Sequence, residues 1–489
     1  MSLKRREFLK AALSAPVVGA FPFVSPQHGI LVNDEHTGTN PTWVERVVQP
    51  VSISEIQEVV RSCQKHHTKI SVSGSRHATG GQQFAADSVL LDMRSFNKIL
   101  SFDGNAGVLG VESGIEWPAL IASYTKAQGN KLAWGIRQKQ GGGDHMSLGG
   151  ALSANAHGHC LAAPPIANDV DWFDIVTADG AVRRCNRKEN RELFSLALGG
   201  YGLFGVIAAV GLRLVPRKKL RRLVEVRTLA EVPPIVEKRT KAGMPFGYFQ
   251  YSIDGSSPEF LRTGILTTYE SVSPETALGK EPADIDEESL VGLLQIAHKN
   301  PGSAYRRYAQ YELSKNGNVE WSDLHQMSTY PLGYHKKIDS SLGEGALGAD
   351  LIVEVYVPRK DLIHFLEKAR PILLESKIPL VYGTVRFIEQ DKDSFLAWAK
   401  QRFACVIFTL HTLTDVTAMK TTGEMCRKLL REAVDRGGSF YLTYNRFAAR
   451  TELDAAYPQF AEFLALKQKY DSEELFQSEW YRHYKKLYA

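Results

Sequence analysis

A histidine and several small residues cluster in the stretch "SVSGSRHATGGQQ", residues 71–83. Glycines at positions 74, 80 and 81 let backbone N–H groups turn toward one point, which makes an anion-binding nest that needs no helix. Apolar runs flank the stretch on both sides, "KISVSG" and "SVLLDM", and predict two short strands. The pattern therefore predicts a phosphate-binding loop between strands, with a plain surface turn as the alternative.

A second glycine-rich stretch, "GGGDHMSLGGALSANAHGHC", covers residues 141–160. Its glycines and small side chains would let the backbone approach a large flat ligand. His157, His159 and Cys160 are potential metal ligands, but within such a loop we interpret them as packing beside the ligand, so no metal site is predicted. Two loops of this kind in one part of the chain favour a binding site over two surface turns.

A G-x-G-x-x-G pattern occurs at Gly200, Gly202 and Gly205. A nicotinamide-binding Rossmann motif requires a strand, then the glycines, then a helix whose N-terminus faces the pyrophosphate. Here the predicted helix "ENRELFSLAL" comes before the glycines and the predicted strand "FGVIAAVGLRLVP" after them. The order is reversed, which argues against a nicotinamide site.

The elements that must position these loops form an α+β pattern. Apolar residues at helical spacing predict helices in "SISEIQEVVRSCQKH" and "EWPALIASYTKAQG", and "DWFDIVTADGAVRRC" predicts a hairpin. Residues 350–446 predict a strand-helix-strand-strand-helix-strand order, typical of a ferredoxin-like layer, whose last strand is "GSFYLTYNRF". Between 219 and 349 only the helix in "NPGSAYRRYAQYELSKNG" is predicted, and no internal repeat is evident.

The composition is that of an ordinary globular protein of 489 residues with a formal charge of +5. That charge is too small to predict a nucleic-acid partner. The five cysteines are scattered and form no C-x-x-C, so neither a disulfide framework nor a zinc site is predicted.

The N-terminus carries "KRREFLK" before a short apolar run, which predicts a twin-arginine signal peptide over residues 1–25. The run is shorter than the about 20 apolar residues that a membrane span needs. We therefore expect a periplasmic or otherwise exported protein, with the twin-arginine translocase as a partner and no stable membrane span. Proteins that use this route are exported already folded, often with a bound cofactor.

Four stretches together resemble the vanillyl-alcohol oxidase family of flavoproteins: "SGSRHATGG", "SLGGALSANAHG", "GGYGLFGVI" and "YPQFAEFLALKQKYDSEELF". Within that family they are most similar to alditol oxidase, the aldonolactone oxidases and decaprenylphosphoryl-ribose oxidase. The resemblance implies a PCMH-type FAD-binding domain of two α/β subdomains at 38–218. It also implies a cap (substrate) domain with an antiparallel sheet flanked by helices at 219–450, and a C-terminal helical segment, 451–489, that packs back on the FAD domain.

The cofactor implied by the resemblance is FAD. The implied FAD-contacting residues are Ser73, Gly74, Ser75, Arg76, His77, Ala78, Gly80, Gly81, Gly149, Gly150, Ser153, Asn155, His157, Gly158, Gly205, Val206 and Ile207. In some relatives the residue matching His77 is bonded to the methyl group of the flavin. Ala78 replaces the serine that usually follows, so covalent and non-covalent FAD both stay open.

Candidate catalytic residues come from the expected cap strands. Arg386 matches an arginine near flavin and substrate in alditol oxidase, and a cation there would stabilise a reduced, anionic ring. His411 on the next expected strand is a candidate base. Tyr444 takes the place of the relatives' catalytic lysine, and Tyr441 and Asn445 share its expected strand.

Together these features predict an exported FAD-dependent oxidoreductase that oxidises a C–OH group of a sugar, polyol or sugar lactone. Oxygen or a redox partner would accept the electrons. Thr384 and Tyr444 stand where relatives carry a glutamate and a lysine. Two alternatives therefore stay open: a dehydrogenase that passes electrons from a lipid-linked or aromatic alcohol to a quinone or another non-oxygen acceptor, and a flavin-binding protein that has lost catalysis.

Overall fold

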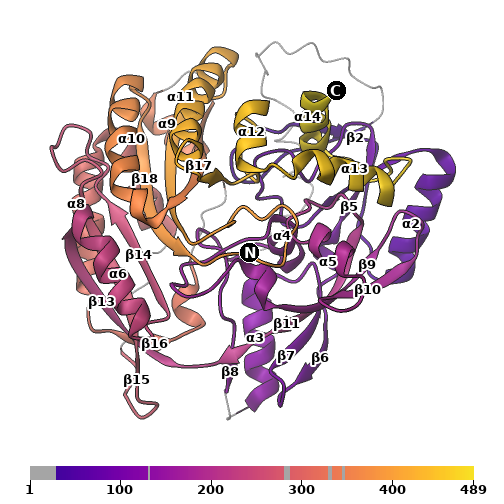
Figure 1. Ribbon diagram of the computed structural model, residues 1–489, viewed down its shortest axis with the longest axis horizontal. Coiled ribbons are helices and arrows are strands. Elements are labelled where there is room, and N and C mark those ends of the chain that lie inside the picture. The colour runs from indigo at the N-terminus through magenta and orange to yellow at the C-terminus, as the bar shows by residue number, and fades with distance from the viewer. Residues whose placement is uncertain (1–28, 130–132, 280–286, 329–332, 344–346) are drawn as a thin grey trace, which may run out of the picture.

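The computed structural model describes residues 29–129, 133–279, 287–328, 333–343 and 347–489. The predicted signal peptide lies outside these residues. Within them the chain folds into two N-terminal subdomains, a large antiparallel sheet with its helices, and a C-terminal helical segment. Figure 1 shows the sheet of the cap on the left, the N-terminal subdomains in indigo and purple on the right, and the yellow C-terminal helices above the latter. The predicted α+β class, with an FAD-binding part and a cap built on an antiparallel sheet, is confirmed.

The first subdomain is a parallel sheet in the order β3-β5-β4, covered by helix α2. Ser52 caps α2 by accepting the Glu55 N–H, and the buried Ile56, Val60 and Cys63 recur at helical spacing toward the sheet. The glycine-rich stretch after β4 therefore leaves the sheet at a strand end. The bounds are β1 Ile30–Val32, β2 Thr42–Val44, β3 Arg46–Val48, α2 Ile53–His66, β4 Lys69–Ser73 and β5 Ser88–Asp92.

The second subdomain is a five-stranded antiparallel sheet in the order β10-β9-β11-β7-β6. Its central strand β11 is almost wholly buried, which explains the near-continuous apolar run in the sequence. The bounds are β6 Ile99–Asp103, β7 Val108–Glu112, α3 Trp117–Gln128, β8 Trp134–Gly135, α4 Leu148–Ala154, β9 Val170–Val176, β10 Val182–Asn186, α5 Arg191–Ala197, β11 Val206–Arg213 and β12 Val215–Pro216. Helix α5 precedes the G-x-G-x-x-G and β11 follows it, as predicted.

The cap sheet has the strand order β16-β13-β15-β14-β18-β19-β17-β20, and every neighbouring pair is antiparallel. Read from its outer edge toward the middle of the sheet, each half has the same order: its fourth, first, third and second strand in sequence. The second half is the predicted ferredoxin-like layer; the first half is a copy of its strand order that the sequence pattern does not reveal. The strands are β13 Lys219–Thr228, β14 Phe246–Tyr251, β15 Thr263–Val272, β16 Val319–Trp321, β17 Gly348–Pro358, β18 Leu380–Ile388, β19 Phe403–Leu413 and β20 Ser439–Phe440.

The prediction of a last strand that runs through Tyr444 is wrong. Strand β20 ends at Phe440, and Tyr441, Tyr444 and Asn445 lie in irregular backbone. The carbonyl of Thr443 accepts hydrogen bonds from the N–H groups of the first glycine-rich stretch, at residues 79 and 80. The chain therefore leaves the sheet to close over that stretch.

The helices of the cap are α6 Val232–Lys241, α7 Glu287–Lys299, α8 Pro301–Ser314, α9 Tyr334–Leu342, α10 Leu362–Ser376 and α11 Val416–Val434. The C-terminal helices are α12 Arg450–Ala456, α13 Phe460–Tyr470 and α14 Glu479–Tyr488. The segment between α13 and α14 reaches the first subdomain, where Gln477 N–H donates to the Ile70 carbonyl at 2.8 Å. Trp480 of α14 packs on Tyr201, with ring centroids 4.7 Å apart. No helix among the described residues is long and apolar enough to cross a membrane.

Candidate functional site

A cavity of about 400 Å³ lies between the two glycine-rich stretches and the cap sheet, within the size range of small-molecule sites. Fifteen of the residues predicted from the sequence line it. They are Ser73, Gly74, Ser75, Arg76, His77, Ala78, Gly149, Gly150, Ser153, His157, Gly205, Ile207, Arg386, Tyr441 and Tyr444. The structure thus brings the two glycine-rich stretches, the end of the G-x-G-x-x-G and the cap residues into one site.

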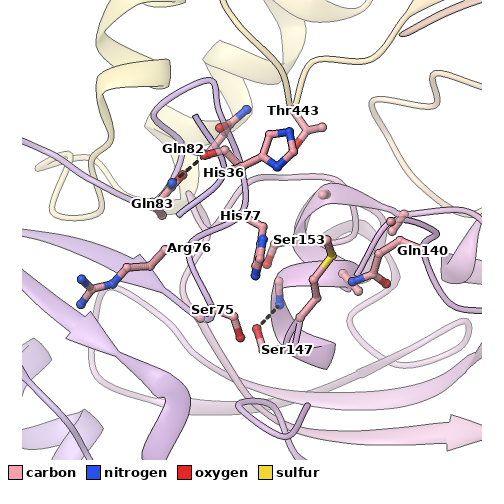
Figure 2. A pocket seen from close by; sticks show the side chains of 18 of the residues that line it. His36, Ser75, Arg76, His77, Gln82, Gln83, Gln140, Ser147, Ser153 and Thr443 are labelled. Carbon is pink, nitrogen blue, oxygen red and sulfur yellow. Dashed lines mark hydrogen bonds between the residues drawn. The ribbon is translucent and has the colours of Figure 1, made fainter. Parts of the chain in front are cut away.

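The first glycine-rich stretch passes close to the second. A Cβ at Gly74 would lie 1.9 Å from the Oγ of Ser147, so only glycine allows this approach. Arg76 takes a left-handed φ of 59°, and its guanidinium pairs at 3.0 Å with the buried carboxylate of Asp92. Figure 2 shows the Arg76 side chain directed away from His77. Arg76 therefore shapes the loop through its backbone and does not offer its charge to the cavity.

Glu116 ties the two stretches together. One carboxylate oxygen accepts from the Ser75 hydroxyl at 2.9 Å, and the other lies 2.9 Å from Nδ1 of His145. The carbonyl of His145 lies 3.0 Å from Nε2 of His77, and because a carbonyl only accepts, Nε2 carries the proton. Burial lowers the pKa of His77. The ring is therefore neutral at pH 7, with its lone pair on Nδ1.

The second stretch forms helix α4, which begins at the cavity. The Ser147 hydroxyl caps α4 by accepting the Gly150 N–H at 3.3 Å. A Cβ at Gly149 would lie 2.9 Å from the Cβ of Ser113, and a Cβ at Gly141 would lie 2.4 Å from a guanidinium nitrogen of Arg386. Glycine backbone therefore forms part of this wall of the cavity, beside the side chains of Met146 and Ser153.

The opposite wall is one face of the cap sheet. Alternate residues of a strand share a face, and the cavity-lining residues of β17, β18 and β19 follow that alternation. They are Ile352, Glu354, Tyr382, Arg386, Ile407 and Thr409. Glu354 was not predicted from the sequence; the available signal was a single acidic residue inside the apolar run "ADLIVEVYVP".

Glu354 is the centre of a buried hydrogen-bond network. Its Oε1 lies 2.5 Å from Nε2 of His157 and also accepts from the hydroxyl of Tyr356, while its Oε2 accepts from the hydroxyl of Tyr444 at 3.2 Å. Nδ1 of His157 lies 3.1 Å from the Gly158 carbonyl, so both ring nitrogens face acceptors and His157 is an imidazolium. Burial by itself raises the pKa of Glu354, but the His157 charge and these hydrogen bonds outweigh it and hold the pKa below its ordinary value.

Tyr444 therefore donates to an ionised carboxylate. Burial, and secondarily the charge of Glu354, raise the pKa of the Tyr444 hydroxyl well above its ordinary value. Tyr441 packs edge-on against Tyr444, with centroids 5.6 Å apart, and its own hydroxyl donates to the Ala154 carbonyl at 2.8 Å. Tyr441 thus fixes the position of Tyr444.

Arg386 is a cation on the cavity wall. Among the residues that the structure describes, no carboxylate forms a salt bridge with its guanidinium. Neighbouring strands hold its backbone, opposite Tyr248 on β14 and Cys405 on β19. The charge is therefore directed to whatever occupies the cavity.

Seven predicted residues do not line the cavity: Gly80, Gly81, Asn155, Gly158, Val206, His411 and Asn445. Gly80 donates its N–H to the Thr443 carbonyl, and Asn445 accepts from the Thr79 hydroxyl, so both residues connect the first glycine-rich stretch to residues 442–446. Asn155 donates to Asp391 and Ser394 behind the wall. Nδ1 of His411 lies 2.9 Å from Oδ1 of Asp350 in a separate cluster. His411 does not line the cavity, so it does not occupy the position expected of the base.

The donor set suits a dinucleotide flavin. Ser73 and Gln83 line the cavity. Their buried atoms Ser73 Oγ and Gln83 Oε1 have no hydrogen-bond partner among the described residues. Such groups are costly to bury unless a ligand satisfies them. Together with the backbone wall at Gly74 and Gly149, they provide a polar cradle beside a long apolar cavity. The residues present therefore fit FAD.

Comparison with known proteins identifies an FAD-binding domain. Residues 44–186 match the model of the FAD binding domain family. Over these residues the chain is similar to this family of FAD-binding domains. The match confirms the predicted family and FAD as the cofactor, and it covers both glycine-rich stretches.

Individual relatives agree with this assignment. The flavoprotein is 32% identical over 168 residues to an uncharacterized oxidoreductase, ORF5 in the fasciation locus of Rhodococcoides fascians, covering 34% of this chain and 37% of that protein. It is 28% identical over 179 residues to a putative D-arabinono-1,4-lactone oxidase of Neurospora crassa, covering 37% and 31%. An L-gulono-1,4-lactone dehydrogenase of Mycobacterium tuberculosis is 23% identical over 440 residues, covering 89% of this chain and 95% of the relative. The first two matches span only about a third of each relative's length.

Proposed function

We propose that this flavoprotein is an oxidoreductase that oxidises a C–OH group of a sugar, polyol or sugar lactone. The support is the FAD-binding domain, a cavity wall that carries an acid–base network and a cation, and relatives named lactone oxidase or lactone dehydrogenase. Bound FAD supplies the hydride acceptor; the residues of the chain orient the alcohol and handle the proton.

The two glycine-rich stretches would hold FAD. The backbone of residues 73–78 would provide N–H donors, and Ser73 and Gln83 would provide side-chain partners. The first turn of α4 would contribute a close wall, because its own N–H groups already donate within the protein. Gly74 and Gly149 keep the backbone close on both sides. Arg386 on the opposite wall would stabilise negative charge that develops on the ring or on the substrate.

Tyr444 would take the proton of the substrate hydroxyl. Its phenol is neutral, so it cannot act as a free base, but its own proton can pass to Oε2 of Glu354 as the substrate proton arrives. Glu354 ends as a carboxylic acid, beside the imidazolium of His157 that held its charge before.

The observation that carries this proposal is the hydrogen bond from Tyr444 to the ionised Glu354 on the wall that faces the FAD-binding loops. The test is anaerobic mixing of the purified yellow protein with a panel of aldonolactones, polyols, sugars and aromatic alcohols, followed by flavin absorbance. Bleaching by a sugar, polyol or lactone is the expected result. If no panel member bleaches the flavin, the result would support a flavin-binding protein without catalysis. If only aromatic alcohols bleach it, the substrate would be an aromatic alcohol and not a sugar, polyol or lactone.

The electron acceptor can be identified in the same samples. Release of hydrogen peroxide in air would make the protein an oxidase. Rapid reoxidation by a quinone with slow reoxidation by oxygen would make it a dehydrogenase. Relatives carry both names, so the acceptor is not decided by similarity.

We also propose that His77 is bonded to FAD. His77 lines the cavity, and its neutral ring with the proton on Nε2 is the form that a covalent bond from Nδ1 to the flavin methyl requires. Acid precipitation tests this link: a yellow pellet whose His77 peptide carries the mass of FAD is expected. A yellow supernatant would show non-covalent FAD and leave the rest of the proposal intact.

Export is a separate proposal that rests on the sequence of residues 1–25. We expect a fusion of this segment to a folded reporter to reach the periplasm through the twin-arginine translocase. Replacing Arg5 and Arg6 by lysines should retain the reporter in the cytoplasm. Export that persists in the double variant would contradict the proposed route.

A further inference from the structure

A second group of titratable side chains lies on the cavity-facing side of the cap sheet. It comprises His298 of α7, Asp350 of β17 and His411 of β19. Asp350 shares its strand face with Glu354, because alternate residues point the same way. Four residues at about 3.3 Å each separate them by roughly 13 Å along β17, so the group is distinct from the Glu354 network, although Tyr334, which lines the cavity, contacts Asp350.

Three potential ligand atoms converge in this group. Nε2 of His298 and Nδ1 of His411 each lie 2.9 Å from Oδ1 of Asp350, and the three atoms lie within 4.8 Å of one another. The side chains are 1%, 6% and 0% exposed for His298, His411 and Asp350. These separations are hydrogen-bond distances, about 0.5 Å shorter than those between ligands of a tetrahedral ion with bonds of about 2.0–2.2 Å, so a bound ion would spread the three side chains slightly.

The protons of His298 favour a cation. Its Nδ1 lies 2.6 Å from the Leu294 carbonyl, which only accepts, so Nδ1 carries the proton. In the neutral imidazole Nε2 then has a lone pair, yet it faces a carboxylate oxygen of Asp350. Two arrangements satisfy both contacts: a second proton on His298, as in His157, or a metal ion between the two atoms.

The surroundings match those of metal-ligating residues. Such histidines donate their other N–H to a carbonyl or carboxylate, and ligating carboxylates accept further hydrogen bonds. His298 has the Leu294 carbonyl, and Oδ2 of Asp350 accepts from the hydroxyl of Tyr334 at 2.7 Å. A Cβ at Gly348 would lie 2.8 Å from Oδ1 of Asp339 and 3.1 Å from Nε2 of His411, so an acid borders the far edge of that ring.

We propose that His298 Nε2, His411 Nδ1 and Asp350 Oδ1 bind one divalent first-row transition metal ion of the Zn²⁺ class. Imidazole and carboxylate ligands suit zinc, cobalt and nickel better than calcium or magnesium. The ion joins α7 to β17 and β19, and α7 contributes Leu290 and Leu294 to the cavity wall. Its role is to hold that helix in place. The three ligands come from distant stretches, so no spacing motif reveals them.

The test uses the full-length FAD-loaded protein. After treatment with a chelator and desalting, the protein is titrated with ZnCl2, and bound metal is measured by plasma mass spectrometry. One equivalent should bind, and zinc should raise the Tm. CoCl2 should give the visible absorption of cobalt bound to protein nitrogen. Binding of less than a tenth of an equivalent, without a change in Tm, would overturn the proposal and leave a doubly protonated His298.

Variants locate the site. His298→Gln should weaken zinc binding by at least about tenfold, whereas His364→Gln, on the exposed face of α10, should leave it unchanged. Cys405→Ser separates the other metal-capable group, formed by His157, Glu354 and Cys405. Retention of the metal by His298→Gln, or its loss in Cys405→Ser alone, would refute the assignment. The titration of the unmodified protein decides the question even where a variant fails to fold.

Discussion

The two walls of the cavity are built in opposite ways. On the FAD-binding side, glycines bring backbone close, and the cation nearest the loop, Arg76, is turned away to Asp92. On the cap side, strands present Arg386, Glu354 and Tyr444, a cation and a proton relay. The difference teaches that one wall holds a ligand by shape and N–H groups, while the other supplies charge. Substitutions should therefore separate FAD binding from turnover.

The largest expected effect comes from the cap wall. Glu354→Gln keeps the shape but removes the proton acceptor, and kcat should fall by about 10²- to 10⁴-fold while the FAD content stays at one per chain. Stopped-flow flavin reduction measures this. The exposed Glu424→Gln on α11 is the control. Loss of FAD together with activity would contradict the separation of FAD binding from turnover between the two walls.

Removing the cation tests the same wall at a second point. Arg386→Met should lower the rate of flavin reduction by about 10²- to 10³-fold, and it should make the flavin harder to reduce, because the negative charge loses its partner. Redox titration gives the second readout. Arg191→Met, exposed at the start of α5, serves as control. An unchanged potential would assign Arg386 to the substrate alone.

The FAD-binding wall responds to a single methyl group. Gly74→Ala would place a Cβ 1.9 Å from Ser147 Oγ and displace the cap of α4. Overpacking of this kind costs about 1–3 kcal/mol, so FAD affinity should fall about 5- to 150-fold. Flavin content after gel filtration measures it. Gly292→Ala has open space around the added methyl group and should keep its FAD.

A smaller effect is expected from the relay's first member. Tyr444→Phe removes one hydrogen bond to a charged group, worth about 1.5 kcal/mol, which corresponds to about tenfold in kcat. Tyr488→Phe removes a comparable phenol–carboxylate bond, to Asp454, far from the cavity. If both variants behave alike, Tyr444 has no role in the relay.

The smallest effect concerns pH. The pKa of Glu354 is lowered in the folded protein, so its carboxylate persists as pH falls to the ordinary value of about 4.3. The stability that comes from the His157–Glu354 pair should be present above that value and lost as pH falls through the folded pKa. Thermal melts of the wild type and Glu354→Gln should converge only below about pH 4.3. Convergence near neutral pH would contradict the ionised pair.

How much the sequence reveals differs between the same two walls. The glycine-rich stretches can be recognised by their spacing, because a site formed by backbone needs glycine at fixed positions. The flanking strands and helices can be predicted from the periodicity of apolar residues. Glu354 gives no such signal, since a buried acid looks like any strand residue until its partners are known. The first half of the cap sheet could not be predicted for a related reason: its strands pair over long distances in the sequence, and such pairing leaves no local pattern. The expected strand through Tyr444 fails because hydrogen bonds to residues 79 and 80 outweigh strand propensity.

The seam between the two halves of the cap sheet has a mechanical consequence. Strands β14 and β18 pair only at Tyr248–Arg386 and Phe249–Val385, whereas β17 and β19 pair along the whole stretch Gly348–Pro358. A sheet opens first where its ladder is shortest. Arg386 thus stands on the strand beside this short ladder, while Glu354 stands on β17, which has its long ladder with β19 on one side and an equally short one with β20 on the other. Bending at the β14–β18 ladder would change the width of the cavity while leaving the acid–base network undisturbed.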